Sequence, residues 1–175
     1  MTNYRRNRVK GGIYFFTVAI VQRHLELLVQ HIDQLKAALR EEKNRAPYTT
    51  LGLVVLPDHL HALWRLPEGD ADYSNRWRRI KAKFSQAIPC GESISASRAS
   101  KGERGIWQRR FWEHTIRDEN DLQRHMDYIH YNPVKHGFVS RAIDWPHSTF
   151  HACVLRGIYA QDWGKGVNVD GNYGE

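Results

Sequence analysis

The stretch LVVLPDHLHALWRL, residues 53–66, decides the fold of this chain. Apolar and β-branched residues fill it on both sides of Pro57-Asp58, a dipeptide that marks a tight connection. The stretch therefore predicts two strands that follow each other closely, at residues 48–56 and 58–66.

The second of these strands carries His59 and His61, two residues apart. Side chains alternate between the two faces of a strand, so both imidazoles should point the same way while Leu60 faces the opposite side. Two parallel imidazoles on a rigid strand form half of a divalent metal site. The same pair also fits two structural histidines that are hydrogen-bonded to the backbone.

Other metal sites compete with this interpretation. A histidine-triad nucleotide hydrolase would need a third histidine at position 63, where this chain has Leu63. His114 is a competing third ligand, and a zinc hydrolase with three histidines would be built that way.

Apolar periodicity and capping residues place the remaining elements around the two strands. These are a strand at 13–21, a helix at 31–44, a helix from Asp72 or Ser74 to Ile88, a strand within 107–117, and a helix that starts at Asp118 or Asn120. The order β-α-β-β-α-β-α predicts an α+β protein with a ferredoxin-like βαββαβ antiparallel sheet and an added C-terminal helix. Helices should cover one face of the sheet and leave the other open for a site.

The length of 175 residues fits a single domain with its own core. We expect this domain at residues 1–163, with a basic N-terminal arm at 1–12 and a mobile Ser/Gly-rich loop at 91–105. A flexible Gly/Asn-rich tail should follow at 164–175. No apolar run approaches the roughly 20 residues of a membrane helix, and the N-terminus lacks a secretory signal, so we expect a cytoplasmic protein.

Two cysteines, Cys90 and Cys153, are too few for a disulfide framework in a chain of this size. The absence of a CxxC pair disfavours a zinc site built from thiolates. Both cysteines are expected to be small buried side chains.

The formal net charge of +7 favours a polyanionic partner, most often a nucleic acid. A basic surface without such a partner is the alternative. The basic residues gather on the N-terminal arm and on the helix that ends near Ile88. The candidates for DNA contact are Arg5, Arg6, Arg8, Lys10, Arg78, Arg79, Lys81 and Lys83.

The last helix contains a polar face that could meet the two histidines. Tyr128 and Asn132 are four residues apart and share this face, whereas Tyr131 lies about 100° per residue further round. Asn132 would add a third, oxygen ligand to a metal, and Tyr128 would be a nucleophile. Because Asn132 precedes Pro133, it could instead cap a short turn, and the helix could kink or end there.

A phenol is a poor nucleophile toward a phosphodiester. Its unperturbed pKa is about 10, and the phosphodiester repels anions. A hard cation such as Mg²⁺ or Mn²⁺ polarises the phosphate and offsets the charge that develops. Mixed nitrogen and oxygen ligands suit Mn²⁺ better than Mg²⁺, although availability can favour Mg²⁺.

Several stretches in this order resemble one protein family over about Tyr4 to Phe150. The matching stretches are YRR at 4–6, GGIYFFTV at 11–18, PDHLH at 57–61, WQRRFWEH at 107–114, YIHYNPVKHG at 128–137 and WPHS at 145–148. The chain resembles the HUH single-strand DNA transposases with one catalytic tyrosine, and more closely the REP-associated tyrosine transposases.

The resemblance implies a fold and a mechanism. The fold is the HUH nuclease fold, with the catalytic tyrosine on the added helix. By position, Tyr128 is the nucleophile that forms a 5'-phosphotyrosyl intermediate, and His59 and His61 are metal ligands. Asn132 stands where insertion-sequence relatives commonly have glutamine. The implied substrate is single-stranded DNA folded into hairpins, and the protein is a monomer or a homodimer.

Two alternatives belong to other functional classes. The first is a protein that binds DNA hairpins without cleaving them. The second is a histidine-ligated metal hydrolase that forms no covalent intermediate.

Overall fold

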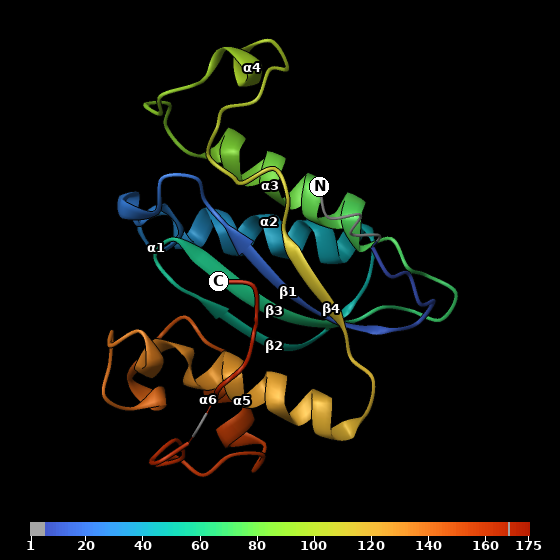
Figure 1. The fold of residues 1–175 in the computed structure, drawn as a ribbon, viewed down its shortest axis with the longest axis vertical. Helices are drawn as coiled ribbons and strands as arrows, with labels where there is room; N and C mark the ends of the chain where they lie inside the picture. The colour runs from blue at the N-terminus through green and yellow to red at the C-terminus, as the bar shows by residue number, and fades with distance from the viewer. Residues whose placement is uncertain (1–5, 168) are drawn as a thin grey trace.

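A four-stranded sheet with helices on both faces organises the protein (Figure 1). The structure is a computed structural model that describes residues 6–167 and 169–175. The strands are β1 (Ile13–Ala19), β2 (Thr49–Val55), β3 (His59–Arg65) and β4 (Trp112–Thr115), in the order β2-β3-β1-β4. All neighbouring strands are antiparallel, which confirms the predicted ferredoxin-like sheet.

Two long helices, α2 (Ile32–Arg45) and α3 (Tyr73–Ala87), cover one face of the sheet. The strands alternate as the sequence predicts, so Phe16 on β1 and Trp64 on β3 point into this layer. Trp64 stacks on Trp77 of α3 with 4.3 Å between ring centroids and 12° between planes. Leu60 belongs to the same buried cluster, which confirms that it faces away from the two histidines.

The opposite face is not open, contrary to the prediction. The helix α5 (Glu119–Lys135) packs there against β2 and β3, and its apolar residue Ile129 belongs to the cluster that contains Phe15 and Leu63. Asp118 caps the helix by accepting a hydrogen bond from the backbone N–H of Asp121 at 2.8 Å. The site must therefore lie between the sheet and α5.

The helix α5 also passes through Pro133, where the sequence suggested a kink or an end. Proline lacks an N–H, so α5 lacks the hydrogen bond that residue 133 would donate to the carbonyl of Ile129, yet it continues to Lys135. Gly137 then closes the last turn with a φ of 73° and donates its N–H to the carbonyl of Val134 at 2.9 Å.

Short elements complete the chain: η1 (Arg23–Leu25), α1 (Leu27–Gln30), α4 (Ala96–Ala99), η2 (Ala142–Asp144) and α6 (Phe150–Leu155). The segment 91–105 thus holds a one-turn helix, α4, within the expected loop. Within the described residues, no helix has both the length and the apolar character to cross a bilayer.

The two cysteines differ. Cys153 on α6 is buried beside Phe150, as predicted, but Cys90 is exposed. Cys90 follows Pro89, beyond the last buried residue of the α3 stripe, and has no layer to pack into.

The C-terminal residues 169–175 run back along the sheet toward β1 and β3 (Figure 1). Tyr173 is buried there, with its ring 5.9 Å from that of Phe15. This packing differs from the flexible tail that the composition suggested, because an aromatic side chain within the Gly/Asn-rich segment finds a buried position.

Candidate active site

The strand β3 places His59 and His61 on the face that α5 covers, as the alternation predicts. Their exposed fractions are 1% and 0%. The rings are not parallel, however: their centroids are 4.9 Å apart and their planes meet at 82°. The prediction of two parallel imidazoles was wrong because each Nδ1 atom binds a different partner.

The Nδ1 atom of His61 lies 2.9 Å from Thr17 Oγ1 on β1. Since the Thr17 hydroxyl donates its one proton to the carbonyl of Tyr173 at 2.5 Å, its oxygen accepts from His61 Nδ1–H. Burial lowers the pKa of His61 to about 4, so the ring is neutral at pH 7. This arrangement leaves the Nε2 lone pair of His61 available as a ligand.

His59 is oriented by Asp58, whose Oδ1 lies 2.7 Å from His59 Nδ1, while Arg23 binds the same carboxylate. Burial alone would lower the pKa of His59, but the hydrogen bond to Asp58 and the nearby carboxylates of Asp58 and Glu175 outweigh it and raise the pKa. The Nε2 atom of His59 is buried and has no hydrogen-bond partner. A buried polar atom without a partner is costly, which suggests that it serves a ligand.

The helix α5 brings Tyr128 and Asn132 to the same place, and both side chains are fully buried. Asn132 lies inside α5 rather than at a helix start, so the capping alternative was wrong. Its Oδ1 atom is buried without a hydrogen-bond partner, like Nε2 of His59. The rival Tyr131 points away, toward Trp163, with 6.4 Å between their ring centroids.

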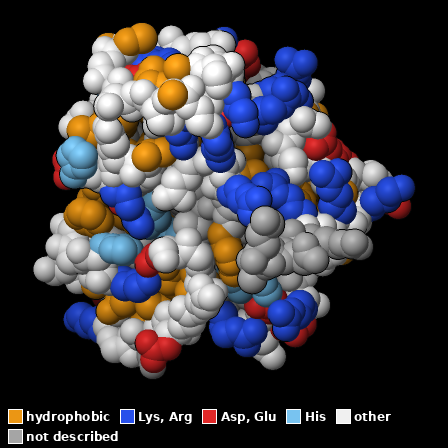
Figure 2. Space-filling model, turned by 45° about the horizontal axis from the view of Figure 1, so that its top comes forward, with side chains coloured by type: hydrophobic (Ala, Val, Ile, Leu, Met, Phe, Trp, Pro, Cys, Tyr) orange, Lys and Arg blue, Asp and Glu red, His pale blue; other side chains and the backbone are white. Residues whose placement is uncertain are grey.

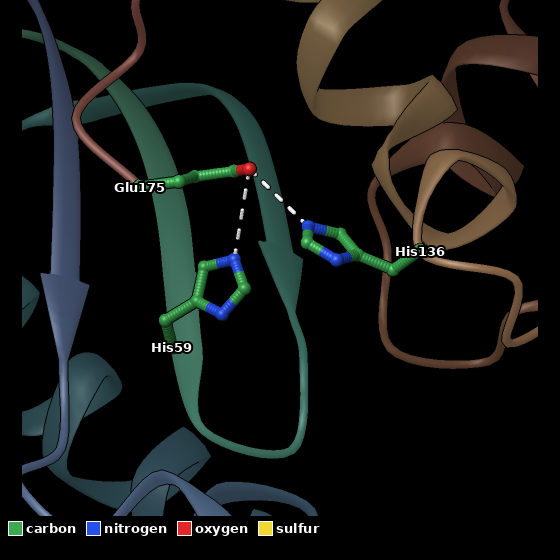
Figure 3. A group of neighbouring side chains, drawn as sticks. All are labelled: His59, His136 and Glu175. Atoms are coloured by element: carbon green, nitrogen blue, oxygen red, sulfur yellow. Dashed lines mark hydrogen bonds and ion pairs between the residues drawn. The ribbon is translucent and has the colours of Figure 1, made fainter.

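The Glu175 side chain enters the space between the strand and the helix (Figure 3). Its Oε1 atom lies 3.0 Å from His61 Nε2 and 2.8 Å from Asn132 Nδ2, and it accepts a hydrogen bond from the Tyr128 hydroxyl. The ring of Tyr173 stacks on that of Tyr128 at 3.6 Å. The C-terminal residues therefore fill the space between β3 and α5.

The side chains of Lys135 and His136 border the Glu175 carboxylate. Lys135 Nζ lies 2.7 Å from Glu175 Oε2 and 3.1 Å from the Tyr128 hydroxyl, and His136 Nε2 lies 3.4 Å from Oε1. Burial would raise the pKa of Glu175, but the contacts of its carboxylate with His136, His59, His61 and Lys135 hold it well below its usual range. Burial, together with the neighbouring Glu175 carboxylate, raises the pKa of Tyr128 above its ordinary value.

Sequence reasoning assigned no role to Glu175, Tyr173, Lys135 or His136. Lys135 had a usable signal, because it is seven residues after Tyr128 and so shares its helical face. Glu175 had none, since nothing local links it to a helix that it contacts from 43 residues away.

The donor atoms here fit a divalent metal ion. His59 Nε2 and Asn132 Oδ1 are orphaned buried atoms, and the free lone pair of His61 Nε2 lies beside them. His59, His136 and Glu175 also offer ligand atoms within 4.8 Å of one another (Figure 3). Imidazole nitrogens with amide or carboxylate oxygens match transition ions such as Mn²⁺ better than Ca²⁺.

His114 does not join this site. Its Nε2 atom binds Asp121 Oδ2 at 2.8 Å, and its ring stacks on that of His125 at 4.6 Å. The ring of Phe15 separates this group from His61, at 4.8 Å from His125 and 5.4 Å from His61. Asn132, rather than His114, is therefore the side chain that lies with the histidine pair.

The basic residues divide into two sets. Arg6, Arg78 and Lys81 line one cavity, whereas Arg79 pairs with Glu42 at 2.6 Å and Lys83 with Glu41 at 3.0 Å. Figure 2, which brings the α3 side of the molecule forward, shows Lys and Arg side chains gathered beside hydrophobic ones. Arg8 and Lys10 are exposed before β1, and Arg5 lies outside the described residues.

Comparisons with known proteins agree on one family, although no protein-family model matches the chain. A protein of Haemophilus influenzae, named provisionally as a REP-associated tyrosine transposase, is 45% identical over 166 residues, 94% of each chain. A REP-associated tyrosine transposase of Escherichia coli K12 is 46% identical and covers 95% of this chain and 93% of its own. A solved structure of a REP-associated tyrosine transposase bound to a REP hairpin is 44% identical, with a TM-score of 0.86 over 100% of this chain and 98% of the other.

Proposed function

Since the chain belongs to the family of REP-associated tyrosine transposases, we propose that it cleaves and rejoins hairpin-forming single-stranded DNA with Tyr128 as the nucleophile. His59, His61 and Asn132 are proposed to hold the divalent metal ion that such a reaction needs. Mn²⁺ suits these nitrogen and oxygen donors better than Mg²⁺.

One observation supports the assignment: a single oxygen atom contacts the proposed nucleophile and two of the three proposed metal-binding residues. Glu175 Oε1 contacts the Tyr128 hydroxyl, the Asn132 amide and His61 Nε2. This carboxylate oxygen stands in for a non-bridging oxygen of a phosphate. A DNA phosphate in the same position would lie against the Tyr128 hydroxyl and beside the side chains of His61 and Asn132.

The metal ion, when bound, polarises the scissile phosphate and offsets the negative charge that develops on it. The two strand residues and the helix residue come from elements that pack directly on one another, so their donor atoms are held before substrate arrives. Asp58 and Thr17 keep the histidine rings in the orientation that leaves each Nε2 atom free.

Tyr128 supplies the covalent step. Its oxygen forms a bond to phosphorus while the bond from phosphorus to the 3' oxygen breaks, which leaves a 5'-phosphotyrosine and a free 3'-OH. The tyrosine loses one proton and the 3' oxygen gains one, so protons balance. Lys135, 3.1 Å from the Tyr128 hydroxyl, can donate to the developing phenolate and contact the phosphate that replaces Glu175.

The test is a covalent adduct. The protein is incubated with Mn²⁺ and an end-labelled hairpin oligonucleotide, denatured, and separated by size. Wild type should give a shifted band, Tyr128→Phe should give none, and the matched variant Tyr131→Phe should behave as wild type. An adduct that persists in Tyr128→Phe would overturn the assignment.

The occupied site also supports a second candidate, a hairpin-binding protein without cleavage. The inserted Glu175 and the raised pKa of Tyr128 both favour an inactive site. If a variant that lacks residues 169–175 binds the hairpin but forms no adduct with Mn²⁺ or Mg²⁺, this second candidate replaces the first.

A further inference from the structure

The end of α5 carries a third histidine, His136, to the site. It follows Asn132 by four residues and Tyr128 by eight, so the three side chains form one stripe along the helix. The backbone N–H of His136 donates to the carbonyl of Asn132 at 3.0 Å, so the helical spacing continues to this residue. Gly137, with a φ of 73°, turns the chain directly after it. The His136 imidazole therefore lies on the face of α5 that covers β3.

Three imidazole nitrogens surround one oxygen atom, Oε1 of Glu175. The Nε2 atoms that surround it belong to His61 at 3.0 Å, His136 at 3.4 Å and His59 at 3.8 Å. Figure 3 shows His59 on the strand and His136 after the helix, both directed at this carboxylate. The position of Oε1 is therefore a point that ring nitrogens from two different elements can share.

The orientation of the rings suits ligands of one ion. The planes of His59 and His136 meet at 70°, with 5.3 Å between the ring centroids. The lone pair of an imidazole nitrogen lies in the ring plane, so tilted rings can direct their lone pairs at one point, which stacked parallel rings cannot. One ligand nitrogen of each residue already lies within 4.8 Å of the other. An ion with bonds of about 2.1 Å holds its ligand atoms about 3 to 4 Å apart, and the His136 side chain, 29% exposed, has room to turn.

The two oxygens of Glu175 separate the imidazoles from the nearby ammonium group. Lys135 Nζ lies 2.7 Å from Oε2, whereas His136 and His61 lie on the Oε1 side. Lys135 already offers a charged contact for a phosphate oxygen. His136 instead joins a set of nitrogen donors that includes His59 Nε2, which is buried without a hydrogen-bond partner. This grouping fits a metal ligand better than a second phosphate contact.

We propose that His136 is a further ligand of the metal ion, beside His59, His61 and Asn132. The inference deepens the proposed function and rests on it, because it concerns the same site. Three imidazoles favour Co²⁺ and Zn²⁺ over Mg²⁺, since nitrogen donors bind these ions more tightly and oxygen donors suit Mg²⁺. His136 therefore helps to set which ion the site selects.

The test is a Co²⁺ titration without DNA, followed by calorimetry and by the visible spectrum of the bound ion. All proteins are full-length and carry Glu175→Gln, because His136 contacts the Glu175 carboxylate and its removal would otherwise weaken a competitor of the metal. His136→Ala should lower Co²⁺ affinity at least about tenfold and alter the spectrum, because water replaces a nitrogen ligand. His24→Ala, which removes an exposed imidazole, should leave both unchanged.

His136→Glu provides a second variant, which keeps a ligand of similar reach but exchanges nitrogen for oxygen. It should lower the ratio of Co²⁺ affinity to Mg²⁺ affinity, because a carboxylate suits Mg²⁺ better than an imidazole does. The Mg²⁺ affinity is measured by displacement of Co²⁺. A ratio equal to that of the parent protein would contradict a ligand role for His136.

Unchanged Co²⁺ affinity and an unchanged spectrum in His136→Ala would overturn the inference. Circular dichroism and the melting temperature confirm that each variant is folded. His61→Ala separates this result from a failure of the proposed function. If His61→Ala lowers Co²⁺ affinity and His136→Ala does not, the metal site stands and only the role of His136 is wrong. If neither variant lowers it, the proposed metal site is wrong as well.

Discussion

Replacing Glu175 by glutamine should raise both the affinity of the site for Mn²⁺ and the yield of the Tyr128 adduct. The glutamine keeps the size of the side chain but removes the negative charge. The carboxylate now lies against His61, Asn132 and Tyr128 and pairs with Lys135 at 2.7 Å. Metal and phosphate need the same space, so Glu175 must leave before they bind.

The contacts set the size of the effect. Lys135 and Glu175 are 36% and 19% exposed at their side chains, so water screens this pair and it is worth at most about 1 kcal/mol. Hydrogen bonds from neutral donors stabilise the inserted Glu175 by about 1 kcal/mol each. The conformational entropy lost when residues 169–175 become ordered offsets part of this stabilisation. If the state with Glu175 in the site is favoured by about 1.4 kcal/mol, the apparent affinity for Mn²⁺ falls about tenfold. Glu175→Gln should recover most of that affinity.

The assay is a Mn²⁺ titration by calorimetry without DNA, followed by adduct formation at sub-saturating Mn²⁺. Glu68→Gln is the matched control, because it makes the same charge change at an exposed turn. Mn²⁺ affinity that falls in Glu175→Gln would refute the reasoning and would identify Glu175 as a metal ligand with His59 and His136. Affinity unchanged within about twofold would show that the inserted carboxylate does not compete.

Three further predictions concern Asn132, Lys135 and His130. Asn132→Ala should lower Mn²⁺ affinity at least tenfold and leave metal-free hairpin binding unchanged; equal losses in both measurements would point to a role in helix stability. Lys135→Gln should slow single-turnover adduct formation about tenfold and leave hairpin affinity unchanged. Lys135→Arg should restore part of the rate. An unaltered rate in Lys135→Gln would exclude a role of Lys135 at the Tyr128 phenolate. Burial lowers the pKa of His130 to about 4 from 6.5, so the stability from its neutral ring is complete above about pH 6.5 and is lost as the pH falls toward 4. The loss should be about 2 kcal/mol at pH 5. Urea unfolding at pH 7 and pH 5 should show a smaller difference for His130→Gln than for wild type, and an identical difference would contradict this assignment.

The parts of the site that lie within one element could be predicted from the sequence. Alternation along β3 put His59 and His61 on one face, and helical spacing put Tyr128 and Asn132 together on α5. The order of strands and helices along the chain followed from the same apolar repeats. Each of these depends on a repeat of two or about four residues that the backbone imposes by itself.

The sequence could not predict other features, because residues distant in sequence determine them. The face expected to be open is covered by α5, the two imidazoles are perpendicular, and Cys90 has no layer to pack into. Pro133 suggested that the helix kinks or ends near Asn132, yet α5 continues through it to Lys135. The basic residues of α3 looked alike in sequence, but Glu42 and Glu41 neutralise two of them.

By itself, then, the sequence determined which side chains share a face and which chemistry they could perform. The tertiary structure alone decided that these faces meet, that Asn132 rather than His114 lies with the histidine pair, and that Glu175 occupies the space between them. The physical reason is that periodicity orients a side chain relative to its own element only. Which group it meets depends on sheet register and on packing between segments more than 40 residues apart, such as Asn132 and Glu175.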